Sequence, residues 1–271
     1  MNRGNPRYDR IAALADVDAL AFKRVTLIGA GSIGLSIATQ MARHGVATCS
    51  PGQLRIIDGD HVEERDLIGT EYRMKHLGTS KVDAAVSIVH EINPDVNISC
   101  WEKMIDDAAV SRVVEVAGQT DLLGLFADSF DVMLKLAKSC AGMCPQVMAA
   151  IGLYADYAEV AFSIPGVTVP IGVTMGSRKR TAIGTPGAFG CDTAFIASFV
   201  ASLCLELLLD PQDRGKLVCC HADAPLFLVG VREPWLFQNE PEETCRSVSC
   251  VYAGPNIRRS GNTEHQSDDD Q

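Results

Sequence analysis

The sequence predicts an α/β protein with a Rossmann-like mixed sheet, made of a parallel nucleotide-binding half and a mostly antiparallel C-terminal half. Three observations predict this fold. Short β-branched runs alternate with segments of helical spacing, which is typical of a doubly wound parallel sheet. A glycine-rich turn joins the first of these runs to the first strongly helical segment. Near the end, two expected strands follow one another closely, at Leu217–His221 and Leu226–Val231.

The elements follow from periodicity and breakers. After a short helical lead up to residue 23, strands are expected at Lys23–Ile28, Gln53–Ile57, Val96–Cys100, near Thr120–Phe126, and at Tyr157–Ile164. Helices are expected over Ser32–His44, Lys81–Asn93, Phe130–Lys138 and Cys191–Leu209, with Pro94 ending the second of them. The glycine-rich stretch Val167–Pro186 predicts a long crossing loop. We expect one domain over residues 1–253 and a disordered acidic tail over residues 254–271, because that tail is rich in Ser, Asn and Asp.

Composition narrows the class of protein. The net charge is −10, so no nucleic-acid or acidic-membrane partner is expected, and the short basic run Arg178–Arg180 is interpreted as a solvated loop. Charged residues occupy the first twenty positions, and no stretch of about 20 uninterrupted apolar residues exists. The longest apolar segment, Phe189–Leu209, is interrupted by Asp192 and Glu206 and is expected to be a core helix. Ten cysteines without a secretion signal predict reduced thiols and a cytoplasmic location.

The glycine-rich turn has the form GxGxxG, with Gly29, Gly31 and Gly34. The first glycine permits a tight turn, the second lets the backbone approach a phosphate, and the third lets the helix pack close to the strand. Amide groups at the helix start then attract an anion. A tight turn without a ligand is the alternative.

Asp58 ends the second expected strand, 24 residues after Gly34. A carboxylate at this place can accept hydrogen bonds from ribose hydroxyls. The same pair of features is expected in a NAD-dependent dehydrogenase, so it does not decide between hydride transfer and adenylation.

The residues after Asp58 discriminate between these classes. The stretch Ile57–Leu67 resembles the D-x-D-x-V-x-x-S-N-L pattern of the ThiF/MoeB-type and ubiquitin-activating adenylyltransferase family. Four other short stretches resemble motifs of that family in the same order: Arg7–Arg10 (R-Y-x-R-Q), His76–Ala85 (G-x-x-K-x-x-A), Glu91–Pro94 (I-N-P) and Ala127–Phe130 (T-D-N-F). The resemblance spans residues 7 to about 210.

The resemblance implies ATP- and Mg²⁺-dependent adenylation of the C-terminal carboxylate of a small ubiquitin-like or sulfur-carrier-like protein. A carboxylate is a poor electrophile, and attack on the α-phosphate of ATP converts it to an acyl adenylate with a good leaving group. Because several anionic oxygens meet in this reaction, positive groups and a metal should carry most of the catalysis. The expected strand Tyr157–Ile164 and the crossing loop would hold the partner's extended tail, as in relatives.

The resemblance also implies roles for single residues. Gly29, Gly31, Ser32 and Gly34 would line the phosphates, with Asp58 on the ribose, Lys81 on the phosphates, Asp128 on Mg²⁺, and Asp60, Asp66 and Ser129 completing the nucleotide site. Arg10 would enter the site of a partner subunit, which implies a homodimer. The alternatives are a solvated helix lysine for Lys81, an N-cap of the 130–138 helix for Asp128, and a surface arginine for Arg10.

This sequence departs from the family at two points of the motif. Asp66 stands where the family has asparagine, and Gly69 where it has an arginine that helps to neutralise the triphosphate. Arg65 and Arg73 are the hypothetical replacements. A non-catalytic scaffold with the same fold is therefore an alternative to the enzyme, beside the dehydrogenase and the ATP-dependent dehydration of a tRNA nucleoside known in the wider family.

The cysteine pattern also differs from that of the family, many of whose members hold a structural zinc with two CxxC pairs. This sequence contains no CxxC pair. Zinc held by Cys219, Cys220 or His221 together with Cys245 and Cys250 is one hypothesis, and buried apolar thiols, including Cys140 and Cys144, are the other. Cys191 is the candidate nucleophile for a thioester, because an expected helix start there would favour the thiolate.

Overall fold

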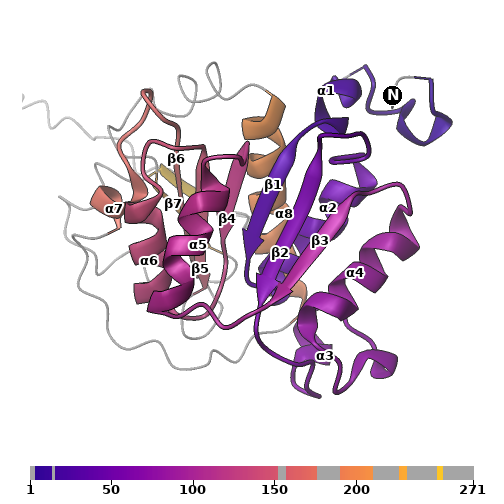
Figure 1. Cartoon of the computed structure of the whole chain (residues 1–271), viewed down its shortest axis with the longest axis horizontal. Coiled ribbons are helices and arrows are strands. Elements are labelled where there is room, and N and C mark those ends of the chain that lie inside the picture. Colours follow the sequence, from indigo (N-terminus) through magenta and orange to yellow (C-terminus); the bar gives the residue numbers. More distant parts are fainter. Residues whose placement is uncertain are drawn as a thin grey trace, which may run out of the picture.

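The computed structural model describes residues 4–13, 16–151, 157–175, 190–209, 226–230 and 249–252. These residues form one eight-stranded sheet in the order β3-β2-β1-β4-β5-β6-β7-β8, with helices on both faces (Figure 1). The strands are β1 Arg24–Ile28, β2 Gln53–Asp58, β3 Ile98–Glu102, β4 Leu122–Leu125, β5 Gln146–Ile151, β6 Tyr157–Ser163, β7 Leu226–Gly230 and β8 Ser249–Tyr252. The α-helices are α1 Val17–Ala21, α2 Ser32–Arg43, α3 Asp66–Gly69, α4 Lys81–Ile92, α5 Asp107–Ala117, α6 Phe130–Ser139, α7 Ile171–Thr174 and α8 Gly190–Leu209.

The strand directions confirm the predicted Rossmann-like mixed sheet. Strands β3, β2, β1, β4 and β5 pair in parallel, whereas β6 is antiparallel to both β5 and β7. β8 then pairs in parallel with β7. The expected strand Leu217–His221 and the tail after residue 253 lie outside the described residues.

Five helices and strands were missed by the sequence reading, and one strand was misplaced. Helix α3 and strand β8 were not expected, and helix α7 lies inside the expected crossing loop Val167–Pro186. Helix α5 and strand β5 also occupy segments for which no element was expected. The spacing of Val110, Val113, Val114 and Ala117 is helical and could have revealed α5, whereas the short apolar run of β5 has no clear period. Strand β3 begins at Ile98 and ends at Glu102 rather than spanning Val96–Cys100. This shift places Trp101 inside the strand and Lys103 directly after it.

Alternation along the central strands divides the core into two layers. Leu27 of β1 and Ile56 of β2 face α2, α4 and α8, whereas Ile28 and Ile57 face α5 and α6, and all four side chains are almost completely buried. Within the described residues, α8 alone is long and apolar enough to cross a membrane by length and composition. However, 56% of its segment Asp192–Leu209 is buried and α2 packs against it, as the sequence predicts for a core helix.

The N-terminal segment is fastened to the edge of the sheet where the parallel strands begin. The buried Asn93 side-chain amide, just after α4, donates to the Tyr8 hydroxyl at 3.0 Å and to the Ala42 carbonyl of α2 at 2.9 Å. The Arg7 guanidinium donates to the Ile92 carbonyl at 2.7 Å. This segment therefore joins the ends of α2 and α4, beside α1 in Figure 1.

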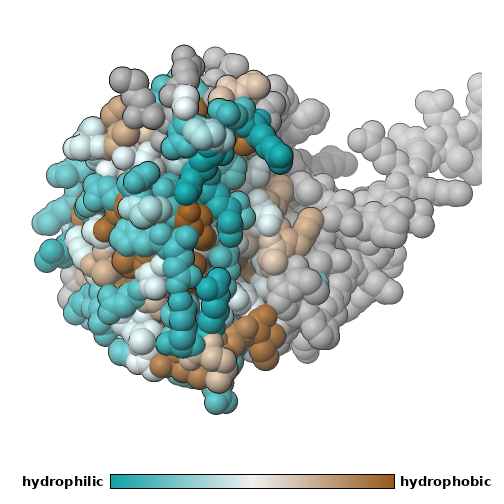
Figure 2. Space-filling model, turned by 90° about the vertical axis from the view of Figure 1, so that its right-hand side faces the viewer, coloured by the Kyte–Doolittle hydropathy of each residue, from teal (hydrophilic) through white to brown (hydrophobic). Residues whose placement is uncertain are grey.

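The segment between β2 and α4 carries exposed apolar side chains. Ile68 of α3 is 72% exposed, and Met74, in the short 3-10 helix Met74–His76, is 71% exposed. Figure 2 shows mostly hydrophilic side chains over this side of the molecule, with hydrophobic surface gathered at its lower end.

Candidate functional site

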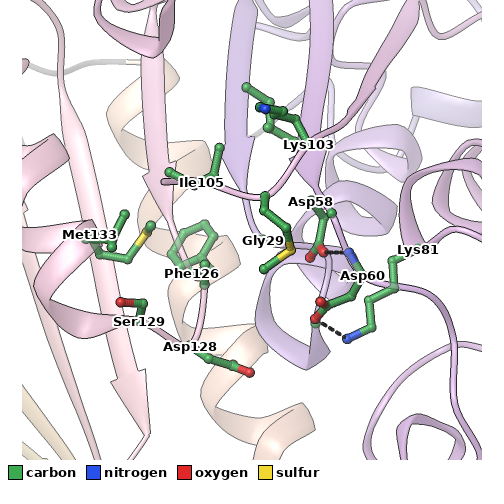
Figure 3. Close-up of a pocket in the computed structure, with 16 residues that line it drawn as sticks. Gly29, Asp58, Asp60, Lys81, Lys103, Ile105, Phe126, Asp128, Ser129 and Met133 are labelled. Atoms are coloured by element: carbon green, nitrogen blue, oxygen red, sulfur yellow. Dashed lines mark hydrogen bonds and ion pairs between the residues drawn. The ribbon is translucent and has the colours of Figure 1, made fainter. Parts of the chain in front are cut away.

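A pocket of about 260 Å³ lies where the parallel strands end. Its walls come from the loops that follow β1, β2, β3 and β4, and from the first residues of α4 and α6 (Figure 3). In an open α/β sheet, ligands bind outside the carboxyl ends of the strands where the strand order reverses. The order around β1, with β2 on one side and β4 on the other, places the pocket at such a point.

The glycine-rich turn has the geometry that its sequence predicts. Gly29 has φ +97°, and a Cβ there would lie 2.7 Å from the backbone carbon of Phe126. A Cβ on Gly34 would lie 2.0 Å from the Gly29 carbonyl oxygen, so both glycines are required by packing. A Cβ on Gly31 would meet no atom within 4 Å, and no side chain caps the start of α2 there. The space at Gly31 therefore suits an anion that approaches the helix start.

Asp58, at the end of β2, braces this turn. Its two carboxylate oxygens accept hydrogen bonds from the Ala30 amide at 2.6 Å and from the Asp60 amide at 2.8 Å. Burial raises the pKa of the Asp58 carboxyl, while these two hydrogen bonds and the Lys81 ammonium act in the opposite direction. Each oxygen keeps a lone pair for a further donor such as a ribose hydroxyl.

Lys81, the first residue of α4, is held among carboxylates at the pocket wall. Its Nζ lies 3.3 Å from Asp60 Oδ2 and 3.5 Å from Asp66 Oδ1. Burial lowers the pKa of Lys81, but Asp66, Asp58 and Asp60 together outweigh burial and raise it, so the group is an ammonium. The residue is 9% exposed, which excludes the alternative of a solvated helix lysine.

Asp128 and Ser129 line the pocket from the side of α6 and are both exposed. In Figure 3 the Asp128 side chain extends toward the side of the pocket where Asp60 and Lys81 lie. The N-cap residue of α6 is Ser129, whose side chain makes no capping hydrogen bond, so the N-cap alternative for Asp128 is wrong. No group of three His, Cys, Asp or Glu residues able to hold a metal occurs in the described part of the chain. Mg²⁺ suits this donor set, because it is often bound by one carboxylate together with nucleotide phosphates.

The remaining candidate residues lie elsewhere. Ser32, Gly34 and Asp66 do not line the pocket, although Asp66 contacts Lys81. Arg10 is exposed two residues after Tyr8, at the opposite edge of the sheet, so it can serve a site only on a second chain.

The two proposed arginine replacements are paired away from the pocket. Arg65 Nε lies 3.1 Å from Glu63, and Arg73 lies 3.0 Å from Glu91 of α4. Neither lines the pocket.

The candidate cysteines lie partly within and partly outside the described residues. Cys191 is the second residue of α8, but its side chain lies outside the described part, as do the candidate zinc ligands Cys219, Cys220, His221, Cys245 and the side chain of Cys250. Cys140 and Cys144 are buried thiols, as the apolar interpretation predicts.

Two residues of the site were missed by the sequence reading. Lys103 follows β3, lines the pocket, and donates its backbone amide to the Asp58 carbonyl at 3.1 Å. The buried Tyr72 hydroxyl lies 2.7 Å from the Ala30 carbonyl and 3.1 Å from the Lys81 carbonyl, so it ties the glycine turn to α4. A correct end for β3 would have revealed Lys103, whereas nothing in the local pattern marks Tyr72.

The pocket has more negative than positive charge. Three carboxylates line it, from Asp58, Asp60 and Asp128, against the two ammonium groups of Lys81 and Lys103. A polyphosphate therefore needs further positive charge in order to bind here.

A glycine-rich strand–turn–helix, an acid after the neighbouring strand, and a pocket between them define a Rossmann-like nucleotide-binding fold. The chain belongs to the ThiF family, whose model matches residues 7–228.

The relatives agree with this assignment. Ubiquitin-like modifier-activating enzyme 5 of Caenorhabditis elegans is 24% identical over 248 residues, which cover 82% of this chain and 58% of that protein. The SAMP-activating enzyme E1 of Haloferax volcanii is 30% identical over 143 residues, or 49% of each chain. The chain thus spans 36% to 58% of the length of the curated relatives it matches.

Solved structures show the same fold. Escherichia coli MccB with AMPCPP and MccA superposes with a TM-score of 0.62 and 19% identity, over 76% of this chain and 64% of that one. PaaA superposes with a TM-score of 0.55 and 22% identity, over 71% of this chain and 58% of that one.

Proposed function

We propose that the chain uses Mg²⁺ and ATP to adenylate the C-terminal carboxylate of a small ubiquitin-like or sulfur-carrier-like protein. The observation that carries this proposal is the pocket in which the open space at Gly31, the carboxylate of Asp58, the ammonium of Lys81 and the carboxylate of Asp128 converge. The relatives are named as activating enzymes for ubiquitin-like modifiers and for SAMP. A NAD-dependent dehydrogenase leaves Lys81 and Asp128 without a role.

The residues of the chain divide the work of binding and charge stabilisation. The amides at the start of α2 bind phosphate oxygens at Gly31, and Asp58 accepts the ribose hydroxyls. Asp128 would hold Mg²⁺, and the metal would supply the positive charge that the lining residues lack. Lys81 then shifts from Asp60 to the phosphates as charge develops during attack by the carboxylate. The partner's C-terminal carboxylate supplies the attacking oxygen, and pyrophosphate leaves.

A second copy of the chain supports the site in this proposal. Arg10 lies too far from the pocket of its own chain to act there. The exposed apolar side chains Ile68 and Met74 lie on the segment between β2 and α4, and they offer a surface for a homodimer. The dimer, the cytoplasmic location and a thioester on Cys191 remain parts of the proposal.

Mass spectrometry tests the function directly. The purified chain is incubated with ATP, Mg²⁺ and each small protein encoded beside its gene, and the products are weighed intact. We expect one partner to gain the mass of an adenylyl group, or ATP–pyrophosphate exchange to depend on that partner. Nucleotide binding without exchange for any partner would favour the non-catalytic scaffold. Failure to bind adenine nucleotides even with Mg²⁺ would overturn the proposal.

A further inference from the structure

A second cavity, of about 330 Å³, lies between β3 and α5, beside the nucleotide pocket. Its apolar wall is formed by Ile57, Trp101, Ile105, Ala109 and Val113, and its cations are Lys103 and Arg112. The two cavities share Ile57, Lys103 and Ile105. In Figure 3, Lys103 and Ile105 lie on the side of the nucleotide pocket opposite Asp128. None of the residues assigned above to the phosphates, the ribose or the metal lines this cavity.

Positive charge gathers around Trp101 without acidic partners. The Arg112 guanidinium carbon lies 4.6 Å from the centre of the Trp101 ring, and that of Arg55 lies 5.3 Å from it. None of the ion pairs among the described residues includes Arg55, Arg112 or Lys103. In a chain of net charge −10, three cations without acidic partners indicate a surface for an external anion.

The two acidic residues nearest to Lys103 in sequence are engaged elsewhere. Asp106 caps α5 by accepting a hydrogen bond from the Ala109 amide at 2.9 Å. Glu102 lies 3.7 Å from His61. Neither carboxylate lines the cavity.

Two buried polar atoms next to this cavity have no hydrogen-bond partner. They are Arg55 Nε and Ser99 Oγ, and their residues are paired in register between β2 and β3. Side chains alternate along strands, so Arg55 and Ser99 share the sheet face of Ile57 and Trp101. Buried polar groups without partners are rare and costly in proteins. Neither residue lines the cavity itself, and Arg55 borders it only through Trp101, whose ring centre lies 5.3 Å from the Arg55 guanidinium carbon.

We propose that the β3–α5 cavity is a second ligand site, for a small organic anion with an apolar or aromatic body and one oxyanion head. The body lies against Trp101, Ile105 and Val113, while the oxyanion pairs with Arg112 and Lys103. The volume and the mainly apolar lining with a few convergent polar groups are typical of small-molecule sites. A guanidinium binds oxyanions through two parallel hydrogen bonds, which gives Arg112 the larger share.

The shared lysine links this ligand to the nucleotide. The Lys103 ammonium borders both cavities and can neutralise one anion fully at a time. A ligand in the β3–α5 cavity should therefore weaken nucleotide binding without preventing it, and the nucleotide should weaken the ligand by the same factor.

Isothermal titration with phenyl phosphate, which has an aromatic body and one oxyanion, tests the site without requiring catalysis. We expect binding at millimolar concentrations or below, and at least about tenfold weaker binding of phenol and of inorganic phosphate, because each lacks one half of the recognition. Arg112→Ala should lower the affinity by about tenfold and Arg112→Lys by less. Arg73→Ala, an exposed arginine at the other end of the molecule, is the matched control and should change nothing. Trp101→Phe should remove any ligand-induced change in tryptophan fluorescence.

The same titration in saturating AMP separates this site from the nucleotide pocket. We expect the affinity for phenyl phosphate to fall a few-fold and binding to persist. The proposal is overturned if AMP abolishes binding, if phenyl phosphate does not bind at millimolar concentrations, or if Arg112→Ala leaves the affinity unchanged. None of these results bears on adenylation, which the partner-dependent exchange measures separately.

Discussion

The two edges of the parallel half of the sheet carry parts of the same family signature and use them differently. At the edge where the strands end, Asp58, Lys81 and Asp128 line a pocket. At the edge where they begin, Tyr8 and Asn93 are almost completely buried and hydrogen bond to each other. The motifs of one family signature therefore include residues that line the pocket and residues that hold the chain together, and sequence alone does not distinguish the two groups.

The difference shows in how polar groups are satisfied. The Asn93 amide has two partners from within the chain, whereas the pocket carboxylates are partly exposed and have free acceptor capacity. Groups satisfied internally contribute to stability, and groups with spare capacity are available to ligands. Substitutions at the two edges should therefore separate activity from stability.

Asp128→Ala should give the largest effect. Exchange of ATP with pyrophosphate should fall by about a hundredfold or more, because the proposed Mg²⁺ ligand is lost. Stability should hardly change, since Asp128 is exposed and caps no helix. Asp131→Ala, an exposed acid of α6 that does not line the pocket, is the matched control. An equal loss in both variants would show that the whole helix, not the carboxylate at 128, matters.

Asn93→Ala should give the converse result. It removes the hydrogen bonds to the Tyr8 hydroxyl and the Ala42 carbonyl and leaves both buried, so the free energy of unfolding should fall by about 2–3 kcal/mol. Tyr8→Phe removes one of these bonds and should lower it by about 1 kcal/mol. Urea denaturation measures both values. Exchange per folded molecule should remain at the wild-type rate, and a loss of turnover at full folding would break the division between the edges.

Much of the edge that carries the pocket was predictable because its residues act through the local backbone. Gly29 and Gly34 are fixed by packing that any strand–turn–helix of this kind requires, and Asp58 follows from the end of β2. Lys103 and Tyr72 were not predictable, because their positions depend on where β3 ends and on a contact between the turn and α4. Periodicity carries no information about such tertiary contacts.

Gly69→Arg should add a cation at the end of α3, next in the chain to the Asp66 turn that contacts Lys81. A Cβ at Gly69 would lie 3.5 Å from the Thr193 hydroxyl, an ordinary contact, so the variant should fold normally. Returning the arginine of the family motif should raise exchange about tenfold, because a hydrogen bond to a charged group contributes roughly 1.5–3 kcal/mol. Gly69→Ala is the control for the backbone change. Equal rates in wild type and Gly69→Arg would show that the chain has no need of this arginine.

Removal of Mg²⁺ should affect ATP far more than AMP. The pocket presents three carboxylates and two ammonium groups, so each added phosphate meets net negative charge unless the metal neutralises it. With EDTA we expect ATP affinity to fall by about tenfold or more while AMP affinity changes little. Titration calorimetry with both nucleotides measures this ratio, and an unchanged ATP affinity would remove Asp128 from the metal site.

The smallest effect is expected at thiols that belong to neither edge. Burial raises the pKa of the Cys140 thiol to about 11. Burial, together with the neighbouring Cys140 thiol, raises the pKa of Cys144 to about 12. Almost no thiolate therefore forms at pH 8. Iodoacetamide should label both slowly in the native protein and rapidly in urea, with peptide mapping by mass spectrometry as the measurement. Since the unfolded thiols ionise near pH 9, stability should hold below that pH and decline as pH rises toward 11. Fast labelling of Cys140 in the native protein would contradict this expectation, because it would show that the buried core beneath α6 opens readily to solvent.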